Sequence, residues 1–346
     1  MVIPAKDIPH LTGLRAVAAL MVMLLHLSQF HAHHLEVFIP FIGQGWLGVD
    51  IFFVLSGYII AHVYKAAFER ISFKPYFVFL WRRIARLYPI HLATLVGLFF
   101  MVTVRGLLDT NWWILSELPS QLLMLHAWSE TSWNLPAWSI SAEWLAYMAF
   151  PLVVLIILRP STVWIPLTTV LILLFLLQIF AVADASLVRS VNGWPAAIRI
   201  ACEFVIGVFG YRVLHTANPH QGFDIAALVC FVAVFLTPYD AIKVVLIAFM
   251  VPCIAASNGP IKLALSTPMA VYLGEISYAI YMCHWPIARV ALNVNKWLGL
   301  EDDPGPLLAI LMILVWSAVI IVISGIVFRL VEMPARRWLR NWELKF

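Results

Sequence analysis

The sequence predicts an all-α fold, that of a polytopic integral membrane protein with about ten transmembrane helices. Hydrophobic residues make up 63% of the chain and charged residues only 12%, whereas charged residues are about 25% of a soluble domain. The apolar residues form long segments, and the basic residues concentrate in alternate connections between these segments. We therefore expect membrane lipids around the chain and no nucleic-acid partner.

Ten segments are apolar enough to be transmembrane helices. They are residues 11–30, 45–64, 86–104, 136–158, 162–183, 195–215, 223–236, 241–257, 270–292 and 306–328. The seventh and eighth are the weakest and meet at Thr237-Pro238-Tyr239-Asp240, a turn-forming sequence. These two segments are either short tilted helices or one re-entrant pair.

The distribution of Lys and Arg predicts the topology. One set of connections holds most of them, whereas the alternate set holds Arg105, Arg189 and Lys296 among several acidic residues. By the positive-inside rule the basic set and both termini are cytoplasmic, which we expect for a protein of the inner cell membrane. Residues 1–346 are expected to form a single transmembrane domain with no appended soluble domain. The basic set consists of Lys6, Lys65, Arg70, Lys74, Arg82, Arg83, Arg86, Arg159, Arg212, Lys262, Arg336, Arg337, Arg340 and Lys345.

Arg15 and His26 are the ionisable pair of the first segment. Such residues are rare inside a membrane span unless they pair, line a cavity or take part in chemistry. Along a helix they are roughly 16 Å apart, so Arg15 lies near the cytoplasmic face and His26 near the membrane centre. This layout suits an enzyme with a cationic anchor and a titratable imidazole. The alternative is a snorkelling Arg and a hydrogen-bonded core His.

The second and third segments also carry ionisable residues. Asp50 lies near the outer end of the second, close to Gly48 and Gly57, which suit close helix packing. A carboxylate in an apolar run needs a partner. Arg83 and Arg86 are three residues apart, so their guanidinium groups point to one side of a helix. That pair either binds a phosphate-bearing ligand or contacts lipid headgroups as a topogenic charge run.

The connection over residues 105–135 and the start of the fourth segment form a third region of interest. The connection carries Trp112, Trp113, Trp128 and Trp133, which are either interfacial belt residues or a platform for stacking sugars. After it, Ser139 and Glu143 are four residues apart and share a helix face. Glu143 is either an acid/base or His-orienting group, or a satisfied structural acid.

Ser277, Tyr281 and His284 form one polar stripe on the ninth segment, because they lie at positions i, i+4 and i+7. Three polar side chains facing lipid would be unfavourable, so the stripe is expected to face the bundle interior. Pro286 lacks an amide hydrogen and frees a backbone carbonyl one turn earlier, near Met282, which allows a kink.

The four cysteines are scattered singly through apolar segments and show no metal-ligand spacing. We therefore expect no metal site and no disulfide framework. The cysteines are Cys202, Cys230, Cys253 and Cys283.

Together these motifs resemble the membrane-bound acyltransferase family 3, whose members O-acylate bacterial surface sugars and related small molecules. The resemblance is carried by R-x10-H at Arg15 and His26, by GVDIFFVLSGY, by R-x-x-R at Arg83 and Arg86, by PAWSISAEW, and by S-Y-x-x-Y-x-x-H-x-P from Ser277. The sequence V-E-M-P near the C-terminus is also similar to the family's ending. These motifs occur in the family's order and extend over most of the chain.

The resemblance implies an O-acyltransferase, expected to be an O-acetyltransferase, that holds no bound cofactor. Its donor substrate would be cytoplasmic acyl-CoA, expected to be acetyl-CoA, and its acceptor a hydroxyl of a cell-surface or lipid-linked carbohydrate. Arg15, Arg83 and Arg86 are the implied acyl-CoA-binding residues. The implied residues that line the acceptor site are Asp50, Ser139, Ser277, Tyr281 and His284.

The expected catalytic residues are His26 and Glu143. His26 would act as general base, a role that the ordinary pKa of histidine suits. Glu143 would orient the imidazole or stabilise its cationic form. A covalent acyl-histidine route stays open. A polytopic secondary transporter or flippase for a glycan or small molecule is the alternative function.

Overall fold

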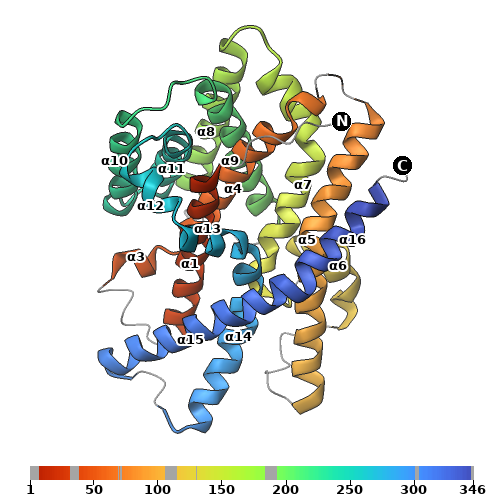
Figure 1. Cartoon of the computed structure of the whole chain (residues 1–346), viewed down its shortest axis with the longest axis vertical. Coiled ribbons are helices and arrows are strands. Elements are labelled where there is room, and N and C mark those ends of the chain that lie inside the picture. Colours follow the sequence, from red (N-terminus) through yellow and green to blue (C-terminus); the bar gives the residue numbers. More distant parts are fainter. Residues whose placement is uncertain are drawn as a thin grey trace. The chain divides into compact units, whose positions relative to one another are not determined.

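The computed structural model describes residues 8–31, 39–68, 70, 72–105, 115–129, 131–183, 193–300 and 304–343. Of the described residues, 85% are helical and none belongs to a strand (Figure 1). Five of its helical segments are long and apolar enough to cross a membrane: Pro9–Phe30, Leu47–Tyr64, Phe73–Thr103, Leu135–Leu158 and Pro306–Trp342. The predicted all-α membrane fold is therefore confirmed.

Each predicted segment contains a helix. In chain order these are α1 (Pro9–His31), α4 (Leu47–Tyr64), α5 (Phe73–Arg105), α7 (Trp138–Val153), α8 (Trp164–Ala183), α9 (Gly193–Leu214), α10 (Gly222–Leu236), α11 (Asp240–Ala255), α14 (Ser277–Trp297) and α15 (Pro306–Val327). Shorter helices are α3 (Pro40–Gly43), α6 (Leu118–Leu122), α12 (Pro260–Leu265) and α13 (Pro268–Glu275). The cytoplasmic location of the termini stays a prediction. Lys6, Arg189 and Lys345, which enter the charge distribution, lie outside the described residues.

Three predicted segments have clearly different limits in the structure. The third is expected to begin at residue 86, but its helix, α5, begins at Phe73. The ninth is divided at Ile276 into α13 and α14, and α14 continues through Pro286 to Trp297. The tenth runs on beyond residue 328 through a π-helical turn, Phe328–Glu332, into α16 (Met333–Glu343). The hydropathy falls there because α16 is rich in Arg and Trp, yet its backbone hydrogen bonds remain internal to the helix.

The chain divides into two compact units. Unit 1 comprises Met1–Arg15, Val49–Trp81 and Ala142–Leu273, and unit 2 comprises Ala16–Gly48, Arg82–Ser141 and Gly274–Phe346. Within unit 1, α9 packs against α8 and α11, and α10 packs against α11. Within unit 2, α14 packs against α15.

Glycine residues allow helices to approach closely in both units. In unit 1, a Cβ atom added to Gly57 of α4 would lie 2.0 Å from the carbonyl oxygen of Phe204 in α9. In unit 2, a Cβ atom added to Gly48 would lie 2.3 Å from the carbonyl oxygen of Ala18 in α1. Real Cβ atoms do not approach carbonyl oxygens so closely, so the predicted packing role of Gly48 and Gly57 is confirmed.

The described part of the connection between α5 and α7 folds back onto α5 within unit 2. Trp133 is buried against Leu95 and Leu98, so this tryptophan is neither a belt residue nor an exposed stacking platform. Trp112 and Trp113 lie outside the described residues. The fold of this connection brings the rings of His91 and His126 into a stack with centroids 5.2 Å apart.

His126 is held neutral in this connection. Its Nε2 atom lies 2.7 Å from the carbonyl oxygen of Ala137, to which it donates a hydrogen bond. Burial, followed by the neighbouring His91 ring, lowers the pKa of His126 to about 3.

Candidate active site

His26 and His284 contact each other in unit 2. The Nδ1 atom of His26 on α1 lies 2.9 Å from the Nε2 atom of His284 on α14. Their rings are stacked at a centroid distance of 5.0 Å and an interplanar angle of 25°. His284 is fully buried, whereas His26 is only half-buried. The imidazole of His284 is therefore closed to solvent, whereas that of His26 is partly accessible.

An aromatic side chain borders the accessible imidazole. The ring of Trp285 meets that of His26 edge-on, with centroids 5.1 Å apart and an interplanar angle of 85°. Phe30 packs on Trp285 in turn, at a centroid distance of 5.0 Å. These contacts limit the rotation of the His26 ring.

The polar stripe of α14 is buried, as expected from its spacing. The hydroxyl of Tyr281 donates a hydrogen bond to the carbonyl oxygen of Pro136 at 2.9 Å and lies 2.9 Å from Oγ of Ser139. Ser277 is fully buried at the start of α14. The predicted site residues Ser139 and Tyr281, 142 positions apart in the sequence, therefore lie together.

The carbonyl that Pro286 frees is satisfied by a residue to which sequence analysis gave no role. The side-chain nitrogen of Asn134, Nδ2, donates a hydrogen bond to the carbonyl oxygen of Met282 at 2.9 Å, and Asn134 is fully buried. Because the carbonyl is bonded by a side chain, α14 passes through Pro286 without ending. The free carbonyl was foreseeable, but its partner was not.

Arg83 and Arg86 lie on α5, and a buried glutamate holds the second of them. Nη1 of Arg86 lies 2.8 Å from Oε1 of Glu332, whose side chain is fully buried. Glu332 belongs to the π-helical turn before α16. The next helix brings Arg336 close enough to Arg83 and Arg86 for electrostatic repulsion. This corner of unit 2 therefore concentrates positive charge.

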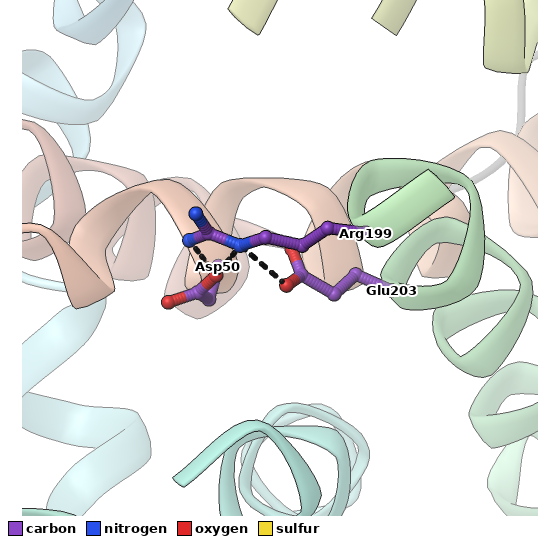
Figure 2. A network of polar contacts seen from close by, with 3 residues as sticks. All are labelled: Asp50, Arg199 and Glu203. Carbon is purple, nitrogen blue, oxygen red and sulfur yellow. Dashed lines mark hydrogen bonds and ion pairs between the residues drawn. The ribbon is translucent and has the colours of Figure 1, made fainter. Parts of the chain in front are cut away.

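Asp50 belongs to a buried network in unit 1 (Figure 2). Nε of Arg199 on α9 lies 2.9 Å from Oδ1 of Asp50 and 3.1 Å from Oε1 of Glu203, and Nη2 of Arg199 also bonds Asp50. All three side chains are 3% exposed or less. Sequence reasoning missed Arg199 and Glu203. Their opposite charges at positions i and i+4 of an apolar segment are the signal that could have identified this pair.

Glu143 is also held within unit 1. Its Oε1 atom accepts a hydrogen bond from the hydroxyl of Ser56 at 2.8 Å and another from the hydroxyl of Tyr147. Arg15 lies in the part of α1 that belongs to the same unit. The assigned role of Glu143 toward His26, and that of Arg15 toward the donor, stay predictions.

A metal centre has little support among the side chains. The described residues contain no group of three or more His, Cys, Asp or Glu side chains that could hold a metal ion. The four cysteines, all of which fall in described parts of the chain, are free thiols. The arrangement in unit 2 instead offers an accessible imidazole, buried hydroxyl groups and a cluster of guanidinium groups, which suits proton transfer and the binding of an anion.

Known proteins resemble this chain along nearly all of its length. The family model for an acyltransferase domain matches residues 8–329. The acyltransferase MdmB of Streptomyces mycarofaciens is 27% identical, over 96% of this chain and 92% of its own length. The peptidoglycan O-acetyltransferase OatA of Listeria monocytogenes is 23% identical, over 96% of this chain and 56% of its own. The O-acetyltransferase OatA of Staphylococcus aureus is 28% identical, over 44% of this chain and 26% of its own.

The chain thus spans about half the length of the Listeria relative. No solved structure matches the chain significantly.

Proposed function

We propose that this chain, which belongs to the acyltransferase 3 family and is an integral membrane enzyme that transfers acyl groups, is an O-acetyltransferase. It would move an acetyl group from cytoplasmic acetyl-CoA to a hydroxyl of a cell-surface or lipid-linked carbohydrate. The observation that carries this proposal is the half-buried imidazole of His26, which forms a hydrogen bond with the buried imidazole of His284 in unit 2. The distribution of basic residues supports cytoplasmic termini in the inner membrane.

The donor site is assigned to Arg83 and Arg86. CoA carries several phosphate groups, and guanidinium groups bind phosphate oxygens through paired hydrogen bonds. Glu332 bonds one nitrogen of Arg86, and within the described residues the other terminal nitrogen, Nη2, has no hydrogen-bond partner. An unsatisfied donor of this kind favours an anionic ligand. Arg15 would help to orient the donor.

His26 is assigned as the general base. It would take the proton of the acceptor hydroxyl as the hydroxyl oxygen forms a bond to the thioester carbonyl carbon. The carbon–sulfur bond then breaks, and the CoA thiolate receives the proton from His26. Glu143 would stabilise the cationic imidazole, and no bound cofactor takes part.

The acceptor is proposed to be a carbohydrate. The Listeria relative is named for acetylation of peptidoglycan, a polymer that contains sugars. Because this chain spans only 56% of that protein, we carry over the class of acceptor and not the polymer. Asp50, Ser139, Ser277 and Tyr281 are the proposed residues of the acceptor side.

The proposal is tested with membranes that contain the full chain, incubated with labelled acetyl-CoA. Label should enter surface or lipid-linked glycans only when the gene is present. The His26→Ala variant should lose transfer, whereas His220→Ala, which removes an exposed histidine, should retain it. Transfer at the wild-type rate by His26→Ala protein would contradict the assigned base.

The donor assignment has its own measurement. Arg83→Ala should raise the KM for acetyl-CoA more than the KM for the acceptor; the reverse order would remove Arg83 from the donor site. Movement of a glycan across the membrane without any CoA-dependent product would instead indicate a transporter.

A further inference from the structure

We propose that His284 fixes the tautomer of His26, so that Nε2 of His26 is the nitrogen that accepts the proton of the acceptor hydroxyl. This inference rests on the proposed function and gives His284 a positioning role instead of a place in the acceptor site. It follows from the hydrogen bonds of the two rings.

The first step is the tautomer of His284. Its Nδ1 atom lies 3.2 Å from the carbonyl oxygen of Ile280, one turn earlier on α14. A carbonyl oxygen only accepts hydrogen bonds, so Nδ1 of His284 carries the hydrogen. A fully buried imidazole without an anionic partner in the hydrogen bonds that it makes is neutral. Its Nε2 atom therefore bears a lone pair and acts as an acceptor.

The second step transfers this constraint to His26. Its Nδ1 atom lies 2.9 Å from Nε2 of His284. Because Nε2 of His284 accepts, Nδ1 of His26 must donate and therefore carries the hydrogen. In neutral His26 the lone pair is thus left on Nε2.

The third step concerns exposure. His284 is fully buried and its two ring nitrogens are engaged, so it has no free atom for a substrate. His26 is only half-buried, and its ring is braced by Trp285. His26 is therefore the ring that a substrate can reach, and its hydrogen bond to the buried His284 determines which of its nitrogens bears the lone pair.

This arrangement also has a consequence for the reaction. When Nε2 of His26 takes the hydroxyl proton, the ring becomes a cation whose Nδ1–H still donates to His284. A hydrogen bond from a charged donor is stronger than one from a neutral donor, so His284 stabilises the charged ring more than the neutral ring. The proton passes from Nε2 to the CoA thiolate, and both rings return to their initial tautomers.

The tautomer is measured directly in the intact wild-type protein. Nitrogen-15 NMR of histidine-labelled protein in lipid bilayers at neutral pH distinguishes protonated from unprotonated ring nitrogens, and the His26→Ala spectrum identifies the His26 signals. We expect hydrogen on Nδ1 of His26 and a lone pair on Nε2. Hydrogen on Nε2 of His26 would overturn the proposal without any need for a variant of His284.

Two variants of His284 then test the kinetic consequence. His284→Leu removes the acceptor and should lower kcat by about 10²-fold with little change in either KM. His284→Gln places an amide oxygen near the position of Nε2, and should recover most of kcat. His91→Leu is the matched control: it removes another buried histidine of unit 2 that bonds a backbone carbonyl, and its kcat should stay close to that of wild type.

The outcomes separate this inference from the proposed function. If His26→Ala is inactive but His284→Leu has wild-type kcat, the positioning role is wrong and the general base stands. A His284→Gln variant that is folded but as slow as His284→Leu would also overturn the role, because an acceptor would not then suffice. If His26→Ala is active, the proposed base itself fails.

Discussion

Replacing Arg199 by Met should strongly destabilise unit 1. Arg199 makes three hydrogen bonds to Asp50 and Glu203, and the side chains of these carboxylates are 0% exposed. Without the guanidinium group, two buried carboxylates face each other with no cation. Breaking a buried ion pair from one side costs about 3–5 kcal/mol. The folding equilibrium should therefore shift by roughly 10²- to 10⁴-fold.

The measurement is thermal unfolding of the purified protein in bilayer nanodiscs, followed by tryptophan fluorescence. A loss of this size corresponds to a fall in Tm of about 10 °C. Arg199→Lys keeps the charge but not the planar fork, so its Tm should fall less. The triple variant Asp50→Val, Arg199→Met and Glu203→Met removes every charge of the network and should melt close to wild type.

Two results would refute this reasoning. The first is a Tm for Arg199→Met within about 2 °C of wild type. Such a shift corresponds to a loss of less than about 1 kcal/mol in the free energy of unfolding, and it would mean that the network contributes little. A triple variant as unstable as Arg199→Met would show that lost packing, and not uncompensated charge, is the cause.

Three further predictions concern other parts of the chain. Gly57→Ala should lower Tm, because its Cβ would lie 2.0 Å from a backbone oxygen. Gly97→Ala, the control, should leave Tm unchanged, because the added Cβ would have no atom within 4 Å. Equal shifts in Tm for the two variants would count against the close contact at Gly57. Glu332→Gln should raise the KM for acetyl-CoA by about tenfold, since it weakens the charged hydrogen bond that holds Arg86; an unchanged KM for the donor in steady-state assays would exclude that role. His126, with its pKa lowered to about 3, stays neutral in the folded protein while the unfolded chain takes up a proton below about pH 6.5. Its contribution to stability is therefore present above that pH and declines as the pH falls toward 3, by at most about 1.4 kcal/mol per pH unit. His126→Phe should flatten this decline in unfolding measured from pH 7 to pH 5, and an unaltered slope would contradict the assignment.

Much of the fold could be predicted because it depends on local properties of the chain. Hydropathy and segment length located the helices, and glycine spacing at Gly48 and Gly57 indicated close packing. The helical period placed Ser277, Tyr281 and His284 on one buried stripe. The chemistry of proline predicted a free carbonyl near Met282. The limits of helices with mixed polarity, such as α16, were missed, because hydropathy does not register an amphipathic continuation. The division of the ninth segment at Ile276 was also missed.

The sequence by itself determined that this is a membrane acyltransferase built of helices and which polar residues lie inside its apolar segments. The tertiary structure decided their partners: His284 for His26, Arg199 for Asp50 and Glu332 for Arg86. The histidines are 258 positions apart in the chain, and helical periodicity relates only residues within a few turns of each other. Which face of one helix meets which face of another depends on packing throughout the unit, and that packing sets which nitrogen of His26 contacts His284.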